Sequence, residues 1–345
     1  MRLKAVFIFL LFTQLSLFSQ EFKSPSDYLT FVNNDQIIIS KSNWKYTQAL
    51  AHTKNANRQD VTKKQLINAI KTAKSKLELL KDGYKGDVEY RDQIIQYYDV
   101  SIKNLSEEYD KIIDMQKVAE QSYDAMEAYL MKRDLINERM NSENEKAHNA
   151  FNAFAKKYNI TVKEGEESEL SKKIKHSNEV FNYHTNLYLI FFKANYTDSN
   201  LSNAIKSDDL GAIQQNAKTL LQYAEEGLSK LNTIVPFEGD NSMIVATRNV
   251  LEYYKKEALD YVPKLVTFLM FNDKFENAKK SLETKSQADR TQEEVDKYNE
   301  MVKQVNKEIN TYNKDSDTNF QEKNTAINTW DTAGDRFISS HVPEN

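Results

Sequence analysis

Glycine and proline are almost absent from this chain, and that scarcity limits what the chain can fold into. The 345 residues contain 7 Gly and 4 Pro, about 3% together where an average globular chain carries roughly 12%. Neither residue occurs among the 78 positions between Gly86 and Gly165. Because β-turns depend on Gly and Pro, this excludes sandwiches, barrels and propellers. With 40% hydrophobic and 28% charged residues, the chain is predicted to be a folded all-α protein.

Start signals and breakers divide the chain into expected helices. Ser24 and Pro25 form a typical helix start, and Thr291 with Glu294 forms a capping-box pattern. Pro263 is expected to kink or split a helix near Tyr261. The predicted helices cover about 25–50, 61–80, 87–158, 169–196, 210–231, 240–283 and 291–341.

The longest predicted helix, 87–158, carries a coiled-coil-like seam of mostly apolar residues from Tyr98 to Tyr158. Unbroken, a helix of this length would span on the order of 100 Å. Polar Arg133 and Asn144 lie on the seam, which leaves a kink or break near 132–145 open. Such seams predict an elongated antiparallel bundle, and they offer faces through which the chain could form a homo-oligomer.

The two halves of the chain repeat one another in the order of their elements. The turn Gly86-Asp87 matches Gly239-Asp240 at an offset of 153, and the apolar positions after it stay in register. The neighbouring helices align at offsets of 143, 151 and 179, although any two amphipathic helices align somewhere. The predicted repeats should match in burial, and the pairs named for this are Leu77 with Leu228 and Leu105 with Ala258.

The segment 1–19 has the layout of a secretory signal peptide. Arg2 and Lys4 precede the apolar stretch Ala5–Phe12, and cleavage is expected after Ser19. This stretch is too short to cross a bilayer, which takes roughly 20 apolar residues, and no later apolar run approaches that length. The predicted organisation is a signal peptide over 1–19, helical repeat one over 20–160 and helical repeat two over 161–345, the two repeats packed as one unit without a membrane span.

The charge and the lack of cysteine exclude several kinds of partner and site. Removing the signal peptide takes away two basic residues and no acids, so the net charge changes from −4 to −6. This acidic balance gives no reason to expect nucleic acid as a partner. Cysteine is absent, which excludes disulfides and thiolate metal sites.

No catalytic motif is recognisable, so we expect no enzymatic activity and no cofactor. The chain contains no P-loop, no Gly-x-Gly-x-x-Gly and no Gly-x-Ser-x-Gly motif. Glu145 and His148 have the Glu-x-x-His spacing of di-iron bundles, and His176 with Glu179 reverses it. A complete site needs two such motifs and two further glutamates. These four residues are therefore weak metal candidates, and exposed helix charges are the alternative.

The repeated turn is the candidate surface for a ligand or partner. Gly86, Asp87, Gly239 and Asp240 would lie at equivalent ends of the two repeats, and helix capping is the alternative reading of both aspartates. Aromatic side chains also cluster within 183–196. They indicate either a stacking surface for a glycan or ordinary core packing.

Several strings resemble a family of secreted helical surface proteins found in Bacteroidetes and spirochaetes. The strings occur in the family's order and are 44-WKYTQALAH-52, 119-AEQSYDAMEAYL-130, 187-LYLIFFK-193, 223-YAEEGLSKL-231, 237-FEGDNS-242 and 338-ISSHVP-343. The resemblance covers nearly the whole mature chain. It implies a periplasmic or cell-surface location in a Gram-negative bacterium, and it assigns no catalytic or ligand-binding residue.

The sequence therefore predicts an exported envelope or cell-surface protein that acts as a non-enzymatic binding or scaffold protein. Its expected partner is an envelope protein or a glycan. Two alternatives remain open: a helical bundle that binds a metal or small ligand, and a soluble accessory subunit of an outer-membrane assembly.

Overall fold

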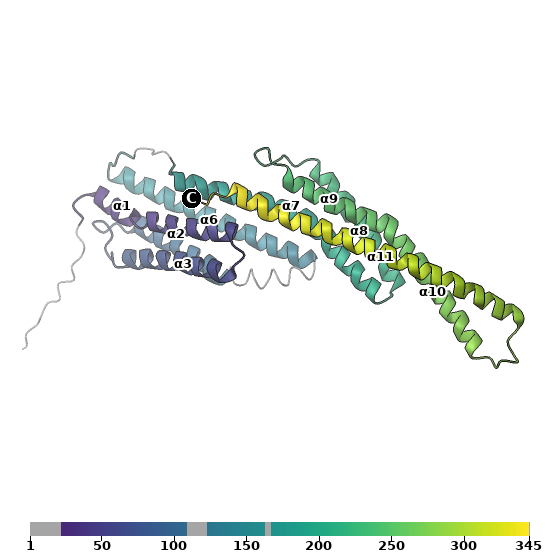
Figure 1. The fold of residues 1–345 in the computed structure, drawn as a ribbon. Helices are drawn as coiled ribbons and strands as arrows, with labels where there is room; N and C mark the ends of the chain where they lie inside the picture. The colour runs from purple at the N-terminus through teal and green to yellow at the C-terminus, as the bar shows by residue number, and fades with distance from the viewer. Residues whose placement is uncertain (1–21, 109–122, 163–166, 345) are drawn as a thin grey trace, which may run out of the picture. The chain divides into compact units, whose positions relative to one another are not determined.

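The structure of the chain is a computed structural model that describes residues 22–108, 123–162 and 167–344 (Figure 1). Helices account for 84% of the residues, and the described residues contain no β-strand. The predicted all-α class is confirmed. No helix in these three ranges is both long enough and apolar enough to cross a membrane.

The observed helices follow most of the predicted ones, with an additional break after Asn33. The α-helices are α1 (Pro25–Asn33), α2 (Gln36–His52), α3 (Ala56–Glu78), α4 (Glu89–Lys103), α6 (Tyr123–Lys157), α7 (Glu169–Lys206), α8 (Leu210–Leu231), α9 (Ser242–Lys256), α10 (Val262–Glu283) and α11 (Gln292–His341), and the π-helices are η1 (Asn104–Glu108) and η2 (Glu257–Tyr261).

The chain divides into two compact units, each with its own packing. The first unit contains the described residues 22–42, 63–108 and 134–162, and the second contains 43–62, 123–133 and 167–344. The predicted boundary after residue 160 lies close to residue 166, after which the chain passes for the last time from the first unit into the second. It misses two shorter stretches, 43–62 and 123–133, which belong to the second unit.

The prediction of one long helix over 87–158 is wrong. Tyr90 contacts Phe151 with ring centroids 5.8 Å apart, and the Ser101 hydroxyl lies 3.9 Å from the Met140 sulfur. As residue numbers rise along α4, the numbers of the partners on α6 fall, so the two helices are antiparallel and the chain reverses between them. The part of the seam at 109–122 lies outside the described residues. No break occurs at 132–145, where α6 is continuous.

The core of the second unit is built by α7, α8, α9 and α11. Its most deeply buried side chains come from all four helices: Leu187, Leu201, Ile213, Leu220, Leu231, Met243, Leu251, Tyr254 and Phe337. In the aromatic cluster at 183–196, Phe191 and Phe192 are buried, and the tyrosines are half-buried around them. This geometry supports core packing for that cluster.

The second unit ends in a long antiparallel hairpin of α10 and α11, joined by a turn at 284–291 (Figure 1). The predicted capping box begins α11, because the Thr291 hydroxyl accepts from the Glu294 N–H at 3.3 Å and the Glu294 carboxylate accepts from the Thr291 N–H at 3.1 Å. Before Pro263, the chain forms the π-helix η2 and continues as α10. The predicted irregularity near Tyr261 is therefore a π-turn, not a split.

Two stretches of the chain contain the same pair of elements at a constant offset. The helix α4 with η1 and the helix α9 with η2 have equal lengths and follow the predicted offset of 153. Their buried positions match, as in Tyr90 with Met243 and Tyr98 with Leu251. Of the predicted pair Leu105 and Ala258, the alanine is buried and the leucine is half-buried.

The buried faces of α3 and α8 match at an offset of 154, not at the predicted 151. Leu77 is buried, whereas Leu228 is only half-buried, and the buried partner at the offset of 154 is Leu231. Three further buried pairs follow the same offset: Leu66 with Leu220, Ile70 with Ala224 and Ala73 with Gly227. The predicted alignment of the two helices is therefore wrong by about one helical turn. Such an error is easy to make from sequence, because a shift of one turn leaves the apolar residues on the same face.

Gly227 is expected to accommodate a larger side chain only at a cost in stability, because α8 closely approaches α9 and α7 there. A Cβ at this position would lie 2.8 Å from Leu251 Cδ1 and 3.0 Å from Ile190 Cγ2. We expect Gly227→Ala to lower the free energy of unfolding by about 1 kcal/mol. Overpacking destabilises by ~1–3 kcal/mol, and the higher helix propensity of alanine offsets about 1 kcal/mol of this. Gly211→Ala is the matched control, because its Cβ meets only Asp209 Oδ1 at 3.5 Å. Urea denaturation that ranks the two variants in the opposite order would contradict this packing.

Candidate functional site

The two Gly-Asp turns take the same backbone conformation. They are Tyr84–Asp87 and Phe237–Asp240, and an isolated antiparallel bridge joins the first and last residue of each. The two central residues have φ of 52° and 84° in the first turn, and of 51° and 88° in the second. Positive φ at both central positions is the geometry of a type I′ turn, which glycine adopts without strain.

The aspartate that closes each turn lies one residue before the N-cap, accepts from the first N–H of the following helix and holds the last helix of its unit. One oxygen of Asp87 and one of Asp240 accept from the backbone N–H two residues on, at 3.3 Å and 2.7 Å. The other oxygen of Asp87 accepts from Lys157 Nζ at 2.8 Å, and that of Asp240 lies 3.0 Å from His341 Nε2. Burial alone would raise the pKa of both carboxyls, but these hydrogen bonds outweigh burial and lower it. The geometry supports capping as the role of both aspartates.

A cluster of four rings surrounds each turn with closely similar geometry. The clusters are Tyr28, Tyr84, Phe154 and Tyr158 in the first unit, and Tyr183, Phe237, Phe337 and His341 in the second. The ring centroids of Tyr84 and Phe154 are 5.9 Å apart, and those of Phe237 and Phe337 are 5.6 Å apart. Tyr84 and Tyr158 are separated by 5.0 Å, and Phe237 and His341 by 5.2 Å. Phe154 and Tyr158 are separated by 4.5 Å, and Phe337 and His341 by 4.7 Å. The last helices therefore match at an offset of 183, one turn away from the predicted 179. Each turn with its rings forms a clasp that ties the ends of three helical segments together.

The candidate metal ligands are not brought together as a set. Glu145 and His148 are exposed on α6, and Glu179 is exposed on α7. His176 lies beside the second turn, where its Nδ1 is 3.6 Å from the carboxylate of Glu238. Within the described ranges, no group of three or more His, Cys, Asp or Glu residues could hold a metal ion.

A buried group of charges lies beneath the π-helix η2, where three elements meet. Lys323 of α11 places its Nζ 2.6 Å from Asp198 Oδ1 of α7 and 2.9 Å from Glu257 Oε1 of η2. Asp198 and Glu257 are 4% and 1% exposed, so this ion-pair network is shielded from solvent. Two carboxylates share one lysine, which leaves one negative charge in excess when both are ionised.

The rest of the network is neutral. Asn319 Nδ2 donates to Glu257 Oε1 at 2.7 Å, and the Tyr253 hydroxyl donates to Asn319 Oδ1 at 2.8 Å. Glu257 Oε2 is buried without a hydrogen-bond partner among the described residues.

The protonation of the network differs from that of exposed side chains. Burial, together with the nearby charge of Glu257, raises the pKa of Asp198 to about 7. Burial alone would lower the pKa of Lys323, but its two carboxylate partners outweigh burial and raise it. At neutral pH the lysine is therefore charged, and Asp198 holds its proton more tightly than an exposed aspartate does.

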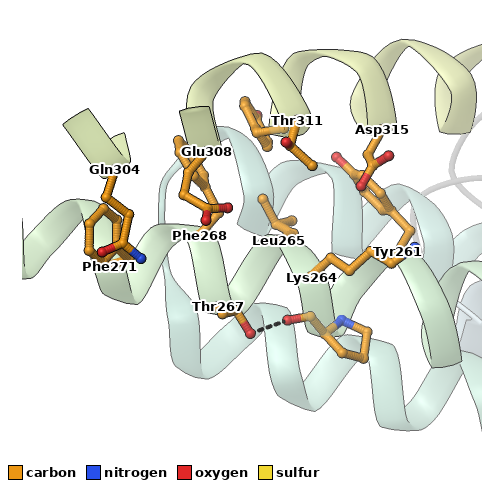
Figure 2. A pocket seen from close by; sticks show the side chains of 12 residues that line it. Tyr261, Lys264, Leu265, Thr267, Phe268, Phe271, Gln304, Glu308, Thr311 and Asp315 are labelled. Carbon is orange, nitrogen blue, oxygen red and sulfur yellow. Dashed lines mark hydrogen bonds between the residues drawn. The ribbon is translucent and has the colours of Figure 1, made fainter. Parts of the chain in front are cut away.

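A groove runs along the hairpin from the end of η2, between α10 and α11 (Figure 2). Its volume is about 680 Å³, within the range of ligand-binding pockets. Aromatic side chains from both helices form its floor, and Phe268 stacks on Tyr312 with centroids 4.5 Å apart and planes 7° from parallel. The other apolar lining residues are Tyr261, Pro263, Leu265 and Phe271.

The rim of the groove is acidic. Lys264 pairs with Asp260 at 2.8 Å. Glu308 and Asp315 line the groove from α11, and neither has an ion-pair partner in the described part of the chain (Figure 2). A smaller pocket continues the groove toward Glu257 and shares Lys264 and Asp315 with it. The groove thus combines an apolar floor with two carboxylates on one side.

Sequence reasoning missed both the network and the groove. The sequence signal for the network is a charged residue on the buried face of a helix. Asp198 is an example, because it lies between the apolar positions Ala194 and Leu201 on that face of α7. The groove corresponds to aromatic residues at steps of 3 and 4 along α10, such as Tyr261 and Phe268, which the sequence alone does not separate from core positions. Comparison of the chain with family models, curated proteins and solved structures finds no match for it.

Proposed function

We propose that this chain is an exported, non-enzymatic binding protein of a Gram-negative envelope, and that it binds its partner in the groove between α10 and α11. The groove is the observation that carries the proposal. It joins a half-exposed aromatic floor to two carboxylates, Glu308 and Asp315, that form no ion pair within 4 Å in the described part of the chain. Exposed apolar grooves with a polar rim are typical of binding sites.

The proposal also draws on an inferred duplication of the two units. Offsets of 153 and 154 for the helix pairs, the two π-helices and the two ring clusters support a common origin. The segment from the turn aspartate to the clasp phenylalanine is shorter in the first unit (Asp87 to Phe154) than in the second (Asp240 to Phe337). The first unit closes its clasp with the shorter segment. The additional length of the second hairpin is therefore not needed for the clasp and is available for binding.

A small ligand is the alternative occupant that the same groove favours, because its volume suits one. The clasps support no second binding site, since the carboxylates of Asp87 and Asp240 are engaged within the chain. The resemblance to secreted surface proteins and the signal-like segment 1–19 support the envelope location.

Paired charge substitutions test the groove as the binding face. Phe271 lines the groove, whereas Phe320 is 65% exposed on α11 and does not line it. We expect immobilised protein with Phe271→Lys to lose the envelope component that the unsubstituted protein captures, because a charge replaces the apolar floor. Phe320→Lys should retain that component, and circular dichroism should show both variants folded. Equal capture by both variants would place binding elsewhere on the chain.

Export makes a separate prediction. Protein purified from its native source should begin near Gln20, because cleavage is expected after Ser19. Amino-terminal sequencing and cell fractionation measure this. A chain that keeps Met1 and fractionates with the cytoplasm would contradict the envelope location.

A further inference from the structure

We infer that the occupant of the groove between α10 and α11 is an amphipathic helix of a partner protein that carries two basic residues seven positions apart. This inference rests on the proposed function and specifies the partner class. It is argued from the packing of the hairpin, the length of the groove and the positions of its free charges.

The packing of the hairpin leaves a place for a third helix. Beyond η2, fully buried residues are few: Val262 and Leu265 on α10, and Val305 on the facing part of α11. The stacked pairs Phe268–Tyr312 and Phe275–Tyr298 are only half-buried. Two helices alone cannot cover both sides of an apolar stripe wider than about 100°, so one side of these rings stays open.

The length of the groove suits a short helical segment. Its lining runs from Tyr261 at the end of η2 to Phe271 on α10, which is about 15 Å at 1.5 Å per residue. On α11 it runs antiparallel from Gln304 to Asp315, about 16 Å. Roughly three turns of a helix fit this length, and apolar residues at steps of 3 and 4 on that helix would meet the aromatic floor.

The charges specify which helix fits. Glu308 and Asp315 lie seven residues apart on one face of α11, about 10 Å along its axis (Figure 2). Lysine or arginine residues seven positions apart on a partner helix would have the same spacing. Only Lys264 contributes a positive charge to the lining. It pairs with Asp260 at 2.8 Å and also attracts Asp315, so the lining keeps an excess of negative charge.

A second copy of the chain is disfavoured by the same charges. Symmetric pairing of two grooves would bring Glu308 and Asp315 of both copies into one interface with no added cation. Like charges at an interface weaken association, whereas complementary charges favour it. The seams that suggest self-association therefore do not supply the occupant of this groove.

Designed peptides test the inference with the full mature chain. The probe is a fluorescent amphipathic helix of about 18 residues with a Leu and Phe stripe and Lys at two positions seven apart. A second peptide has Glu at those positions, and a third has the residues of the first in an order without a stripe. We expect saturable binding of the first peptide, with affinity about tenfold or more above that of the second. The third should show no saturable binding.

Substitutions in the protein make the assignment specific. The double variant Glu308→Lys with Asp315→Lys should reverse the preference, so that the Glu peptide binds more tightly than the Lys peptide. The matched control is Glu276→Lys with Glu283→Lys, two exposed acids that are also seven apart on α10 but lie outside the groove. This control should leave the preference for the Lys peptide unchanged.

Three results would overturn the inference. They are no saturable binding of the Lys peptide, equal affinity for the Lys and Glu peptides, and a dimer in sedimentation velocity whose dissociation is needed before the peptide binds. If any of them occurs while Phe271→Lys still abolishes capture of an envelope component, the helical partner is wrong and the groove remains the binding face. If Phe271→Lys also leaves capture intact, the proposed function fails with it.

Discussion

Replacing Lys323 by Met should lower the free energy of unfolding by about 3–5 kcal/mol at about pH 8, the cost of breaking a buried ion pair from one side. The substitution leaves Asp198 and Glu257 buried beside each other without the cation that now lies 2.6 Å and 2.9 Å from them. Methionine fills a similar volume, so the loss is of charge and not of packing. Urea denaturation followed by circular dichroism measures the effect. Lys314→Met on the exposed face of α11 is the control, and it should change stability by less than about 0.5 kcal/mol.

The cost of Lys323→Met should depend on pH in a defined direction. The folded pKa of Asp198, about 7, lies above its ordinary value of 3.8. The native state therefore holds this proton more tightly than the unfolded chain does. The stability that this adds is complete below about pH 4 and is lost as the pH rises through 7. In the variant, acid also removes the uncompensated charge, so the cost at about pH 5.5 should be well below that at about pH 8. An equal cost at both values would mean that the carboxylates are not a coupled buried pair.

Trp330→Ala should cost about 3–5 kcal/mol, because it removes the largest side chain that joins α11 to the core of the second unit. Trp330 is 4% exposed and stacks on Phe191, with ring centroids 4.2 Å apart. Its indole N–H also donates to the Thr247 hydroxyl at 3.0 Å, and without it that buried hydroxyl would keep only its own hydrogen bond to the Met243 carbonyl.

Phe320→Ala is the control for this prediction. Phe320 lies on the same helix and is 65% exposed, so its truncation should change the free energy of unfolding by less than about 0.5 kcal/mol. Circular dichroism should report both transitions, since tryptophan fluorescence changes when Trp330 is removed. A loss of less than about 1 kcal/mol for Trp330→Ala would contradict the packing of α11 on α7 and α9.

The all-α fold could be predicted from the sequence because it depends on local signals. The scarcity of Gly and Pro, the cap at Ser24 and the capping box at Thr291 each act within one turn of helix. The reversal between α4 and α6 could not be predicted. A seam at steps of 3 and 4 is the same whether one long helix carries it or two antiparallel helices face each other with it.

The register between the matching helices shows the same limit at a finer scale. The Gly-Asp turn fixes the offset of 153, because only one spacing superposes Gly86 on Gly239. Helices without such a turn, such as α3, can be aligned one helical turn too early or too late, because that shift keeps the apolar residues on the same face. The offsets of 154 and 183 become visible only from which residues are buried and which rings touch.

The candidate site depends on contacts between residues far apart in the chain, and this is why sequence reasoning did not find it. Asp198, Glu257 and Lys323 are separated by many helical turns and lie on three different elements, so no local spacing connects them. Glu308 and Asp315 have an ordinary spacing for an exposed helix face. Only the position of α10 opposite α11 shows that these acids border an aromatic floor.

The claim that the groove between α10 and α11 is the binding face is tested most directly by site-specific photo-cross-linking in intact cells. Gln304 is exposed and lines the groove, and Asn306 is exposed two residues later on the opposite side of α11. A photo-reactive amino acid at 304 should give a discrete cross-linked product, and the same group at 306 should give none. Cross-linking at 306 as strong as at 304, or at neither position, would contradict the account.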